Sequence, residues 1–311
     1  MADLISVAMT TYNGEKYLAD QIDSILVQSY SNFELIICDD CSTDTTRTIL
    51  KAYASKDNRV KLHFNKTNLG FKKNFEQALN FCSGQFIALA DQDDVWTKNH
   101  LEALLSCIGE HDIACSNSVL VDEKLNSLDT DMKTICHFTS VPEDKSKLFF
   151  YFLFGNNFVQ GAASLIRRDF LLKVLPIPDF ISFHDYWFGI NAAAGNGIAY
   201  LENPTLYYRQ HGNNITNNTN KIFKKVKDVI SNVKKMKMIC TANLLTCEYF
   251  LATNTKYSDE IMLAKQILLA QKQSKLIKYT FLFIRYYKMI FNQENYNFFI
   301  SRFFLRILCH E

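Results

Sequence analysis

Short apolar runs alternate with helical patterns over the first 121 residues, and most of the runs stop at polar residues. Nearly continuous apolar runs are typical of strands buried on both faces, whereas apolar residues spaced three and four apart are typical of helices. The expected strands cover residues 4–9, 33–38, 60–64, 85–90 and 113–121, and the expected helices cover 15–28, 42–55, 72–82 and 97–108. Because strands that alternate with helices of this length form successive βα units, we predict an α/β fold with a mostly parallel central sheet.

The alternation weakens after residue 121. Helices are expected over 142–154, 169–174 and 184–194, and short strands over 163–168, 198–201 and 205–208. The polar run 213–220 (NNITNNTN) is typical of a loop, and the segment after it is predicted to form a C-terminal helical extension. We therefore divide the chain into residues 1–121, 122–218 and 219–311.

The composition of the 311 residues is that of a folded protein, with 48% hydrophobic and 21% charged residues. These fractions exclude the collagen-like, disulfide-rich and broadly disordered classes. The nine cysteines are an odd number and lie mostly in apolar runs, so we expect reduced thiols. The N-terminal residues lack the basic segment and cleavage site of a secretory signal, which leads us to expect a cytoplasmic protein.

The formal net charge of +2 conceals two segments of opposite charge. Residues 1–218 hold 18 Lys and Arg against 26 Asp and Glu, a net charge of −8, whereas residues 219–311 hold 16 against 6, a net charge of +10. The acidic main body contains no recognisable nucleic-acid-binding motif. We therefore expect no nucleic-acid partner.

The basic C-terminal segment is also rich in aromatic residues, but it contains no run of about 18 apolar residues that could span a bilayer. Lys275, Lys278, Arg285 and Lys288 lie within about 140° of one another on a helical wheel. Such a basic stripe predicts a helix that lies in an anionic membrane interface, here the inner face of the plasma membrane. The alternative is a helical cap that packs on the rest of the chain and exposes its lysines to solvent.

Polar residues follow three of the expected strands. They are Thr10–Asn13, Asp39 with Asp40, and Asp91–Asp94. Because ligands of parallel α/β sheets bind at the carboxyl ends of the strands, we expect these segments to share one rim of the sheet and to form the ligand site.

Three carboxylates lie within four residues in the segment Asp91–Asp94 (DQDD). They repel one another unless a cation neutralises them, and oxygen-only ligands favour Mg²⁺ or Mn²⁺. Water and the phosphate oxygens of a substrate would fill the remaining coordination positions, which indicates a diphosphate ligand. The alternative is structural, because Asp93 and Asp94 precede the helix expected from Thr97 and could only cap it.

Asp40 and Tyr12 have side chains suited to holding a nucleobase. A carboxylate such as Asp40 accepts the ring N–H of uracil or thymine, and the Tyr12 ring can stack on a base. The alternative for Asp40 is entry into the following helix, for which Ser42 is the expected N-cap. Neither GxGxxG nor GxxxxGKS/T occurs, which argues against dinucleotide binding of the Rossmann type and against P-loop chemistry.

Four segments carry a resemblance to a known family: MTTYNG, FELIICDDCSTDTT, NLGFKKNFEQAL and FIALADQDDVW. In this order they resemble the nucleotide-sugar half of family 2 glycosyltransferases of the GT-A (nucleotide-diphospho-sugar transferase) fold, over about residues 4–121. The later segments GAASLIRR, HDYW and YRQHGNN are similar to bacterial rhamnosyltransferase-like members that build O-antigen, capsule or cell-wall polysaccharides. The resemblance implies a nucleotide-sugar-binding half in 1–121 and an acceptor-binding, catalytic half in 122–218.

The resemblance also implies roles for individual residues. Thr10, Tyr12 and Asp40 match the base-binding positions, while Asp91 and Asp93 match a DxD motif in which Asp93 is the direct metal ligand. His211 matches a position that in some relatives completes metal or diphosphate binding. Asp185 matches the catalytic base, where His184 replaces the usual Glu of a Glu-Asp pair.

Four further residues are assigned from their place beside these motifs. Lys72 and Arg209 are expected to help neutralise the diphosphate, with a solvated helix position as the alternative for Lys72. Trp187 is expected to stack on a sugar, whereas Trp96 is expected in the core.

These expectations together describe an inverting, metal-dependent glycosyltransferase that uses Mn²⁺ or Mg²⁺. Its donor would be a UDP- or dTDP-sugar, and its acceptor a glycan or a lipid-linked molecule. Two alternatives remain at this point: a sugar nucleotidyltransferase, which would need a Gly-rich loop after the first strand, and a non-catalytic, membrane-docked nucleotide-binding partner in glycan assembly.

Overall fold

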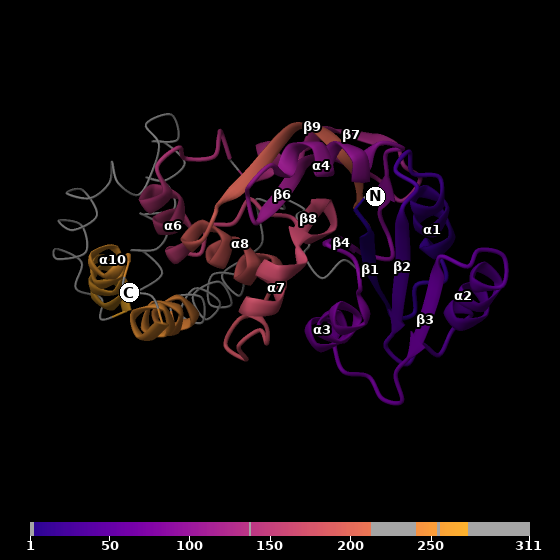
Figure 1. Ribbon diagram of the computed structural model, residues 1–311, viewed down its shortest axis with the longest axis horizontal. Coiled ribbons are helices and arrows are strands. Elements are labelled where there is room, and N and C mark those ends of the chain that lie inside the picture. Colours follow the sequence, from indigo (N-terminus) through magenta and orange to yellow (C-terminus); the bar gives the residue numbers. More distant parts are fainter. Residues whose placement is uncertain (1–2, 137, 213–240, 254–255, 273–311) are drawn as a thin grey trace, which may run out of the picture. The chain divides into compact units, whose positions relative to one another are not determined.

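A computed structural model describes residues 3–136, 138–212, 241–253 and 256–272 (Figure 1). The chain forms two compact units. Unit 1 consists of Met1–Cys136 and Val159–Asn217, and unit 2 consists of His137–Phe158 and Asn218–Glu311.

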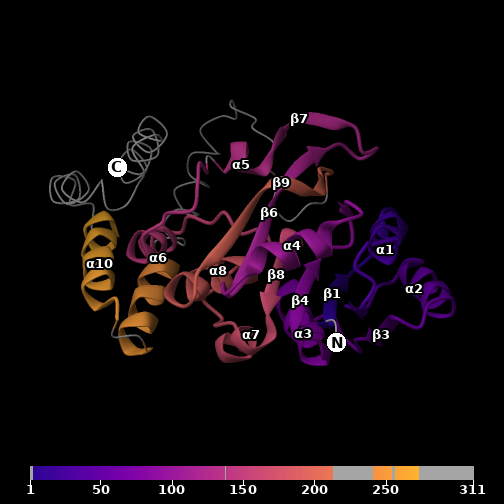
Figure 2. The ribbon, with the colours of Figure 1, turned by 45° about the horizontal axis from the view of Figure 1, so that its top comes forward.

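Unit 1 contains a mixed, curled sheet whose strands follow the order β3-β2-β1-β4-β8-β6-β9-β5, with β7 paired to β6. The strands are β1 (Ile5–Thr11), β2 (Phe33–Asp39), β3 (Val60–Phe64), β4 (Phe86–Ala90), β5 (Val95–Trp96), β6 (Ile113–Val121), β7 (Ser127–Asp131), β8 (Ser164–Arg167) and β9 (Ile198–Arg209). The first four strands are parallel to one another, and β9 runs parallel to β6 beside it (Figure 2). Strand β8 is antiparallel to both of its neighbours, so it joins two parallel groups into one sheet.

Helices pack on both faces of this sheet. Those of unit 1 are α1 (Leu18–Leu26), α2 (Thr46–Ala54), α3 (Phe71–Phe81), α4 (His100–Ile108), α5 (Met132–Ile135), α7 (Arg168–Val174) and α8 (His184–Ala194), with a 3₁₀ turn at Gly161–Ala163. One core is built from alternate residues of the strands, such as Val7 and Met9 of β1, packed against Ile22 of α1 and Leu101 of α4. Helix α3 also contacts β1 and β2. Strands β1, β2 and β4 are buried along almost their whole length, which explains their nearly uninterrupted apolar sequences, whereas the edge strand β3 is partly exposed.

The predicted α/β fold with a mostly parallel sheet is confirmed, and the structure corrects some details. The two short strands expected at 198–201 and 205–208 are one strand, β9, whose pairing with β6 shifts register between Ser116 and Ser118. The short elements β5, β7 and α5 were not expected. Helix α2 begins at Thr46, because the hydroxyl of Ser42 donates to Asp39 instead of capping the helix.

Unit 2 is helical in its described parts. It contains α6 (Lys145–Leu153), a helix over residues 241–253, and α10 (Ser258–Lys272). The ring of Phe149 packs 5.1 Å from Phe250 and 4.9 Å from Tyr257, centroid to centroid. Among the described residues, no helix combines the length and apolarity needed to cross a bilayer. The predicted basic stripe of Lys275, Lys278, Arg285 and Lys288 lies outside the described residues.

Candidate functional site

The loops that follow β1, β2 and β4 lie at one end of the parallel strands. Thr11 of β1 pairs with Asp39 of β2, and Met9 pairs with Ala90 of β4, so the three strands end almost level. The first residues beyond them are Tyr12, Asp40 and Asp91. The expectation that these segments share one rim therefore holds in the structure.

A side chain of the acidic loop ties it to the loop after β1. The Tyr12 amide donates to Gln92 Oε1 at 2.9 Å, and Gln92 Nε2 donates back to the Tyr12 carbonyl at 3.1 Å. The pairing leaves the Tyr12 ring exposed at 47% of its surface. Sequence reasoning missed Gln92, because a carboxamide between acids carries no signal of its own.

Gly14 makes this pairing possible, because a Cβ atom at that position would lie 2.2 Å from Gln92 Oε1. We predict that Gly14→Ala displaces Gln92 and lowers the protection of the Tyr12 amide against hydrogen exchange, while the protein stays folded. Native-state hydrogen exchange at the Tyr12 amide measures this loss of protection. Gly212→Ala is the matched control, because a Cβ there meets nothing within 4 Å, and an equal loss in both variants would contradict the prediction.

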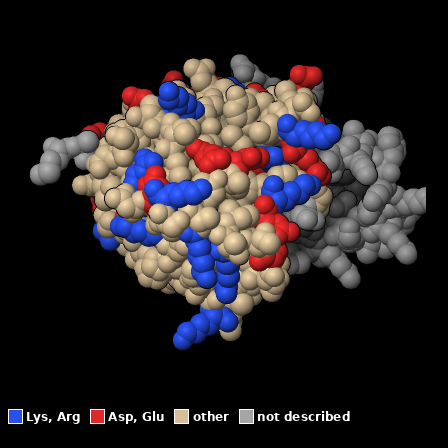
Figure 3. Space-filling model, turned by 90° about the vertical axis from the view of Figure 1, so that its right-hand side faces the viewer, with Lys and Arg blue, Asp and Glu red and all other residues tan. Residues whose placement is uncertain are grey.

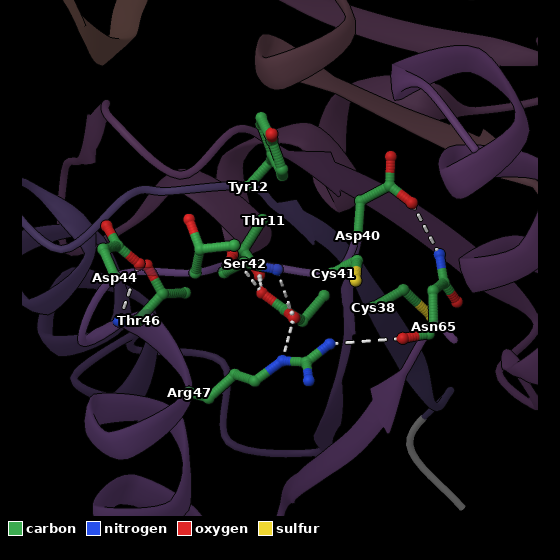
Figure 4. A network of polar contacts seen from close by, with 12 residues as sticks. Thr11, Tyr12, Cys38, Asp40, Cys41, Ser42, Asp44, Thr46, Arg47 and Asn65 are labelled. Atoms are coloured by element: carbon green, nitrogen blue, oxygen red, sulfur yellow. Dashed lines mark hydrogen bonds and ion pairs between the residues drawn. The ribbon is translucent and has the colours of Figure 1, made fainter. Parts of the chain in front are cut away.

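Asp39 organises the loop after β2, and Figure 4 labels its partners Thr11, Ser42 and Arg47. Its buried carboxylate accepts hydrogen bonds from the Ser42 amide at 3.1 Å, from the hydroxyls of Thr11 and Ser42, and from Arg47 Nε at 2.6 Å. Asn13, which has a φ of 48°, accepts from the Thr43 amide at 2.8 Å. The charge-assisted bond from Thr11 to Asp39 and the neutral bond from Thr43 to Asn13 therefore join the segments that follow β1 and β2.

Asp40 is almost fully buried and holds the loop that leads into α3. Its Oδ1 accepts from Asn65 Nδ2 at 2.9 Å and from the Leu69 amide at 2.8 Å, and its Oδ2 accepts from the Gly70 amide at 2.8 Å. Asn65 is in turn bonded to Asn74 of α3. Three of about four acceptor positions on the carboxylate are thus used, and one is left for a ligand donor.

The acidic loop after β4 is electrostatically strained. Burial, together with the nearby charges of Asp93 and Asp185, raises the pKa of Asp91 to about 7. Burial and the charges of Asp93 and Asp91 also raise the pKa of Asp94, and Asp94 Oδ2 has no hydrogen-bond partner in the described part of the chain. The charge of Asp185 contributes to this shift, so the start of α8 lies near enough to the acidic loop to affect the pKa of Asp91.

The end of β9 supports the acidic loop. The Arg209 amide donates to Asp94 Oδ1 at 3.0 Å, and Arg209 Nε donates to the Asp93 carbonyl at 2.8 Å. Its remaining nitrogens donate to Asp20 Oδ2 and to the Glu123 carbonyl, both at 2.8 Å, and the residue is 2% exposed. Arg209 therefore supports the acidic loop. Its three guanidinium nitrogens donate to other residues, so it does not present an open cation to a diphosphate.

His211 contacts Asp93 directly. Its Nε2 lies 2.8 Å from Asp93 Oδ2, and its ring lies 4.8 Å from that of Tyr17. The contact orients the carboxylate that the sequence singled out as a metal ligand.

Asp185 lies in the first turn of α8, and its neighbour His184 anchors that turn. The His184 ring packs 4.4 Å from Phe75 and 5.9 Å from Phe188, centroid to centroid. Gly161 allows this approach, because a Cβ there would lie 2.7 Å from His184 Nε2. Burial lowers the pKa of His184 to about 4, so the imidazole is neutral near pH 7 and adds no charge beside Asp185.

Two expected site residues are engaged elsewhere. The Trp187 side chain is fully buried and its indole N–H donates to the Val174 carbonyl at 2.7 Å, so its ring is not open to a sugar. Lys72 Nζ donates to the carbonyls of Pro178 and Ile181 at 3.2 and 3.0 Å, which holds the segment before α8 against α3. Trp96 lies in the core, as expected.

The carboxylate oxygens of the acidic loop suit a hard divalent cation as ligands. A bound cation would also offset the repulsion between the carboxylates that raises the pKa values of Asp91 and Asp94. Within the described ranges, no group of three His, Cys, Asp or Glu side chains converges to hold a metal. Mg²⁺ is usually held by one or two carboxylates together with substrate phosphates. Asp91 and Asp93 match that arrangement.

Figure 3 shows the face of unit 1 that carries α1, α2 and β3. Acidic side chains form a band across it, and Lys and Arg side chains gather around the band. This face therefore carries charges of both signs rather than one basic surface.

A family model described as glycosyl transferase family 2 matches residues 6–175. Among curated proteins, the chain is 37% identical over 126 residues to the UDP-Glc:alpha-D-GlcNAc-diphosphoundecaprenol beta-1,3-glucosyltransferase WfgD of Escherichia coli. This alignment covers 38% of the chain and 49% of that relative. The chain spans about half or less of the length of the first curated relatives it matches.

Two solved structures show a similar fold. The TarS 1-349 structure from S. aureus in complex with UDP-GlcNAc has a TM-score of 0.58 and 19% identity, and covers 98% of this chain and 82% of that one. Mannosyltransferase PcManGT from Pyrobaculum calidifontis, in complex with GDP-Man and Mn²⁺, has a TM-score of 0.51 and 13% identity, with 100% and 86% covered.

Proposed function

The chain belongs to glycosyl transferase family 2, and we propose that it is an inverting, metal-dependent glycosyltransferase. Its donor is a UDP- or dTDP-sugar, its acceptor is a glycan or a lipid-linked molecule, and its product is part of a bacterial surface polysaccharide. The observation that carries the proposal is the acidic loop after β4, where the charges of Asp93 and of Asp185, which comes from a distant part of the chain, both raise the pKa of Asp91.

The loops after β1 and β2 supply the donor site in this proposal. The free acceptor position on Asp40 takes the ring N–H of uracil or thymine, and the exposed Tyr12 ring stacks on the base. Thr10 lies partly exposed at the end of β1. The printed name of WfgD, which specifies UDP-Glc, and the UDP-GlcNAc bound to TarS support a UDP-linked donor.

Asp185 acts as the general base. It takes the proton of an acceptor hydroxyl while that oxygen forms a bond to the anomeric carbon of the donor sugar. The bond from the anomeric carbon to the diphosphate oxygen breaks, its electron pair leaves with the nucleoside diphosphate, and the single displacement inverts the anomeric centre. His184 is neutral near pH 7 and adds no positive charge beside Asp185.

Asp91 and Asp93 would hold Mn²⁺ or Mg²⁺, and His211 orients Asp93 for that role. The bound ion supplies charge neutralisation at the diphosphate. Arg209 keeps the backbone of the acidic loop in place from beneath. In this proposal, residues 219–311 contact the inner face of the plasma membrane peripherally.

A thermal-shift screen of UDP-, dTDP- and GDP-sugars, each with and without Mn²⁺, tests the donor class. We expect UDP- or dTDP-sugars with Mn²⁺ to stabilise the protein by about 2.7 kcal/mol at one hundred times the Kd, and GDP-sugars to have no effect. Formation of a UDP-sugar and pyrophosphate from UTP and a sugar 1-phosphate would favour a sugar nucleotidyltransferase, and binding of the UDP-sugar without any turnover would favour a non-catalytic partner. If no nucleotide stabilises the protein, the proposal is wrong.

A further inference from the structure

An exposed aromatic side chain lies two residues before Asp185. Phe183 is the N-cap residue of α8, has an extended backbone and exposes 42% of its surface. Its ring lies 6.1 Å from that of Phe71, the first residue of α3, at an interplanar angle of 35°. Single exposed apolar residues are common on proteins, so its surroundings decide whether this one is significant.

The segment that carries Phe183 is held in place from both sides. Lys72 Nζ donates to the carbonyls of Pro178, Asp179 and Ile181, and the Ile181 side chain is buried. On the other side, the half-buried His184 ring packs on Phe75. Three hydrogen bonds from one lysine and a buried neighbour are more support than an incidental surface residue needs, because ordering both costs conformational entropy.

The proposed reaction sets what must lie beside Asp185. The acceptor brings a hydroxyl to this carboxylate, and the group that bears the hydroxyl extends over the adjacent surface. A pyranose ring offers a flat face of C–H groups with its hydroxyls at the edge. Such a face matches a rigid aromatic ring, which provides a large apolar contact and loses little conformational entropy on binding.

The geometry points to Phe183, supported by Phe71, as the platform on which the acceptor's terminal pyranose ring stacks while its hydroxyl faces Asp185. We infer that the acceptor ends in a sugar ring and not in a linear polyol, which has no flat face to present. This inference rests on the proposed function. Phe183 is then a specificity-determining residue. An acceptor whose hydroxyl is held in position against Asp185 reacts faster than one that is only nearby.

Saturation-transfer NMR on the full chain, with UDP and Mn²⁺ present, tests the inference using methyl glycosides of glucose, N-acetylglucosamine and rhamnose as probes, and ribitol as the linear comparison. We expect the ring C–H protons of at least one glycoside to receive saturation, and ribitol to receive little. Phe183→Ala should reduce the glycoside signal at least fivefold, and Phe183→Tyr should retain it. If Phe183→Ala does not fold, Phe183→Leu, which keeps apolar bulk without a flat ring, takes its place with the same expected loss.

Phe81→Ala is the matched control. Phe81 is 43% exposed at the opposite end of α3 and also has one ring neighbour, His63. An unchanged signal in Phe183→Ala, an equal loss in Phe81→Ala, no glycoside signal in the wild type, or an equal signal from ribitol would each overturn the inference.

Donor binding separates this inference from the function it rests on. Phe183→Ala should bind UDP and UDP-glucose as tightly as the wild type, whereas a selective loss of affinity for UDP-glucose would assign Phe183 to the donor sugar and overturn the inference. If UDP binds the wild type but the glycoside signal does not depend on Phe183, the platform alone is wrong. If UDP does not bind the wild type, the proposed function is wrong.

Discussion

Asp185→Asn is expected to lower the rate of sugar transfer by about 10²- to 10⁴-fold, the usual contribution of a general base. The amide keeps the size of the side chain but cannot accept the proton of the acceptor hydroxyl. Donor affinity measured without metal should remain within about threefold of the wild type, because Asp185 lies in the first turn of α8, outside the loops proposed to hold the nucleotide. The measurement is release of nucleoside diphosphate with a donor and acceptor pair that the wild type turns over.

Asp169→Asn is the control for this substitution. It makes the same chemical change on α7, at a side chain that is 76% exposed, and should leave the rate unchanged. Full activity of Asp185→Asn, or an equal loss in both variants, would contradict the role of Asp185 as the base.

Asp93→Asn is expected to abolish the Mn²⁺-dependent part of UDP binding, leaving only the weaker affinity seen without metal. In the wild type this part should depend on pH. The pKa of Asp91 is raised to about 7, so at pH 6 the carboxyl is mostly protonated and the metal must displace a proton, whereas at pH 8 it is ionised and free to bind. We expect Mn²⁺-dependent affinity to fall about fivefold between pH 7 and pH 6, in step with the ionised fraction of Asp91, and to change little above pH 8.

Isothermal titration of UDP with and without Mn²⁺, at pH 6, 7 and 8, measures both effects. Metal-free UDP binding is the internal control, and it should vary much less over this range. A Mn²⁺ effect that survives in Asp93→Asn, or that is as strong at pH 6 as at pH 8, would remove the acidic loop as the metal site.

Much of the fold follows from the sequence pattern, because the inner parallel strands β1, β2 and β4 are almost fully buried and leave apolar runs. The runs at 60–64 and 113–121 match β3 and β6 residue for residue. Strand β5 is only two residues long, and β7 (SLDTD) is mostly polar and exposed, so neither leaves a periodic signal. In β9 the exposed residues around Pro204 interrupt the apolar pattern, so the sequence predicted two strands. The structure has one strand, because its pairing with β6 shifts register at this point and then continues.

The predicted site depended on topology, which brings the ends of β1, β2 and β4 to one rim. The sequence pattern does not predict which distant residues contact one another in the fold. The donors of Arg209 are taken by Asp20, Asp93 and Glu123, all distant in sequence. Trp187 lies next to the Asp185 turn but on the buried side of α8, and no local pattern distinguished that side from the exposed one.

The hydrogen bond from Arg209 to Asp20 joins residues 189 positions apart and fastens the last strand of unit 1 to its first helix. During synthesis the ribosome must therefore release the chain beyond residue 209 before the acidic loop gains its guanidinium support. Until then Asp20 and the carbonyl of Asp93 lack this partner, and the nascent chain carries an unfinished, negatively charged rim. Completion of the binding site is thereby coupled to a late, non-local step of folding.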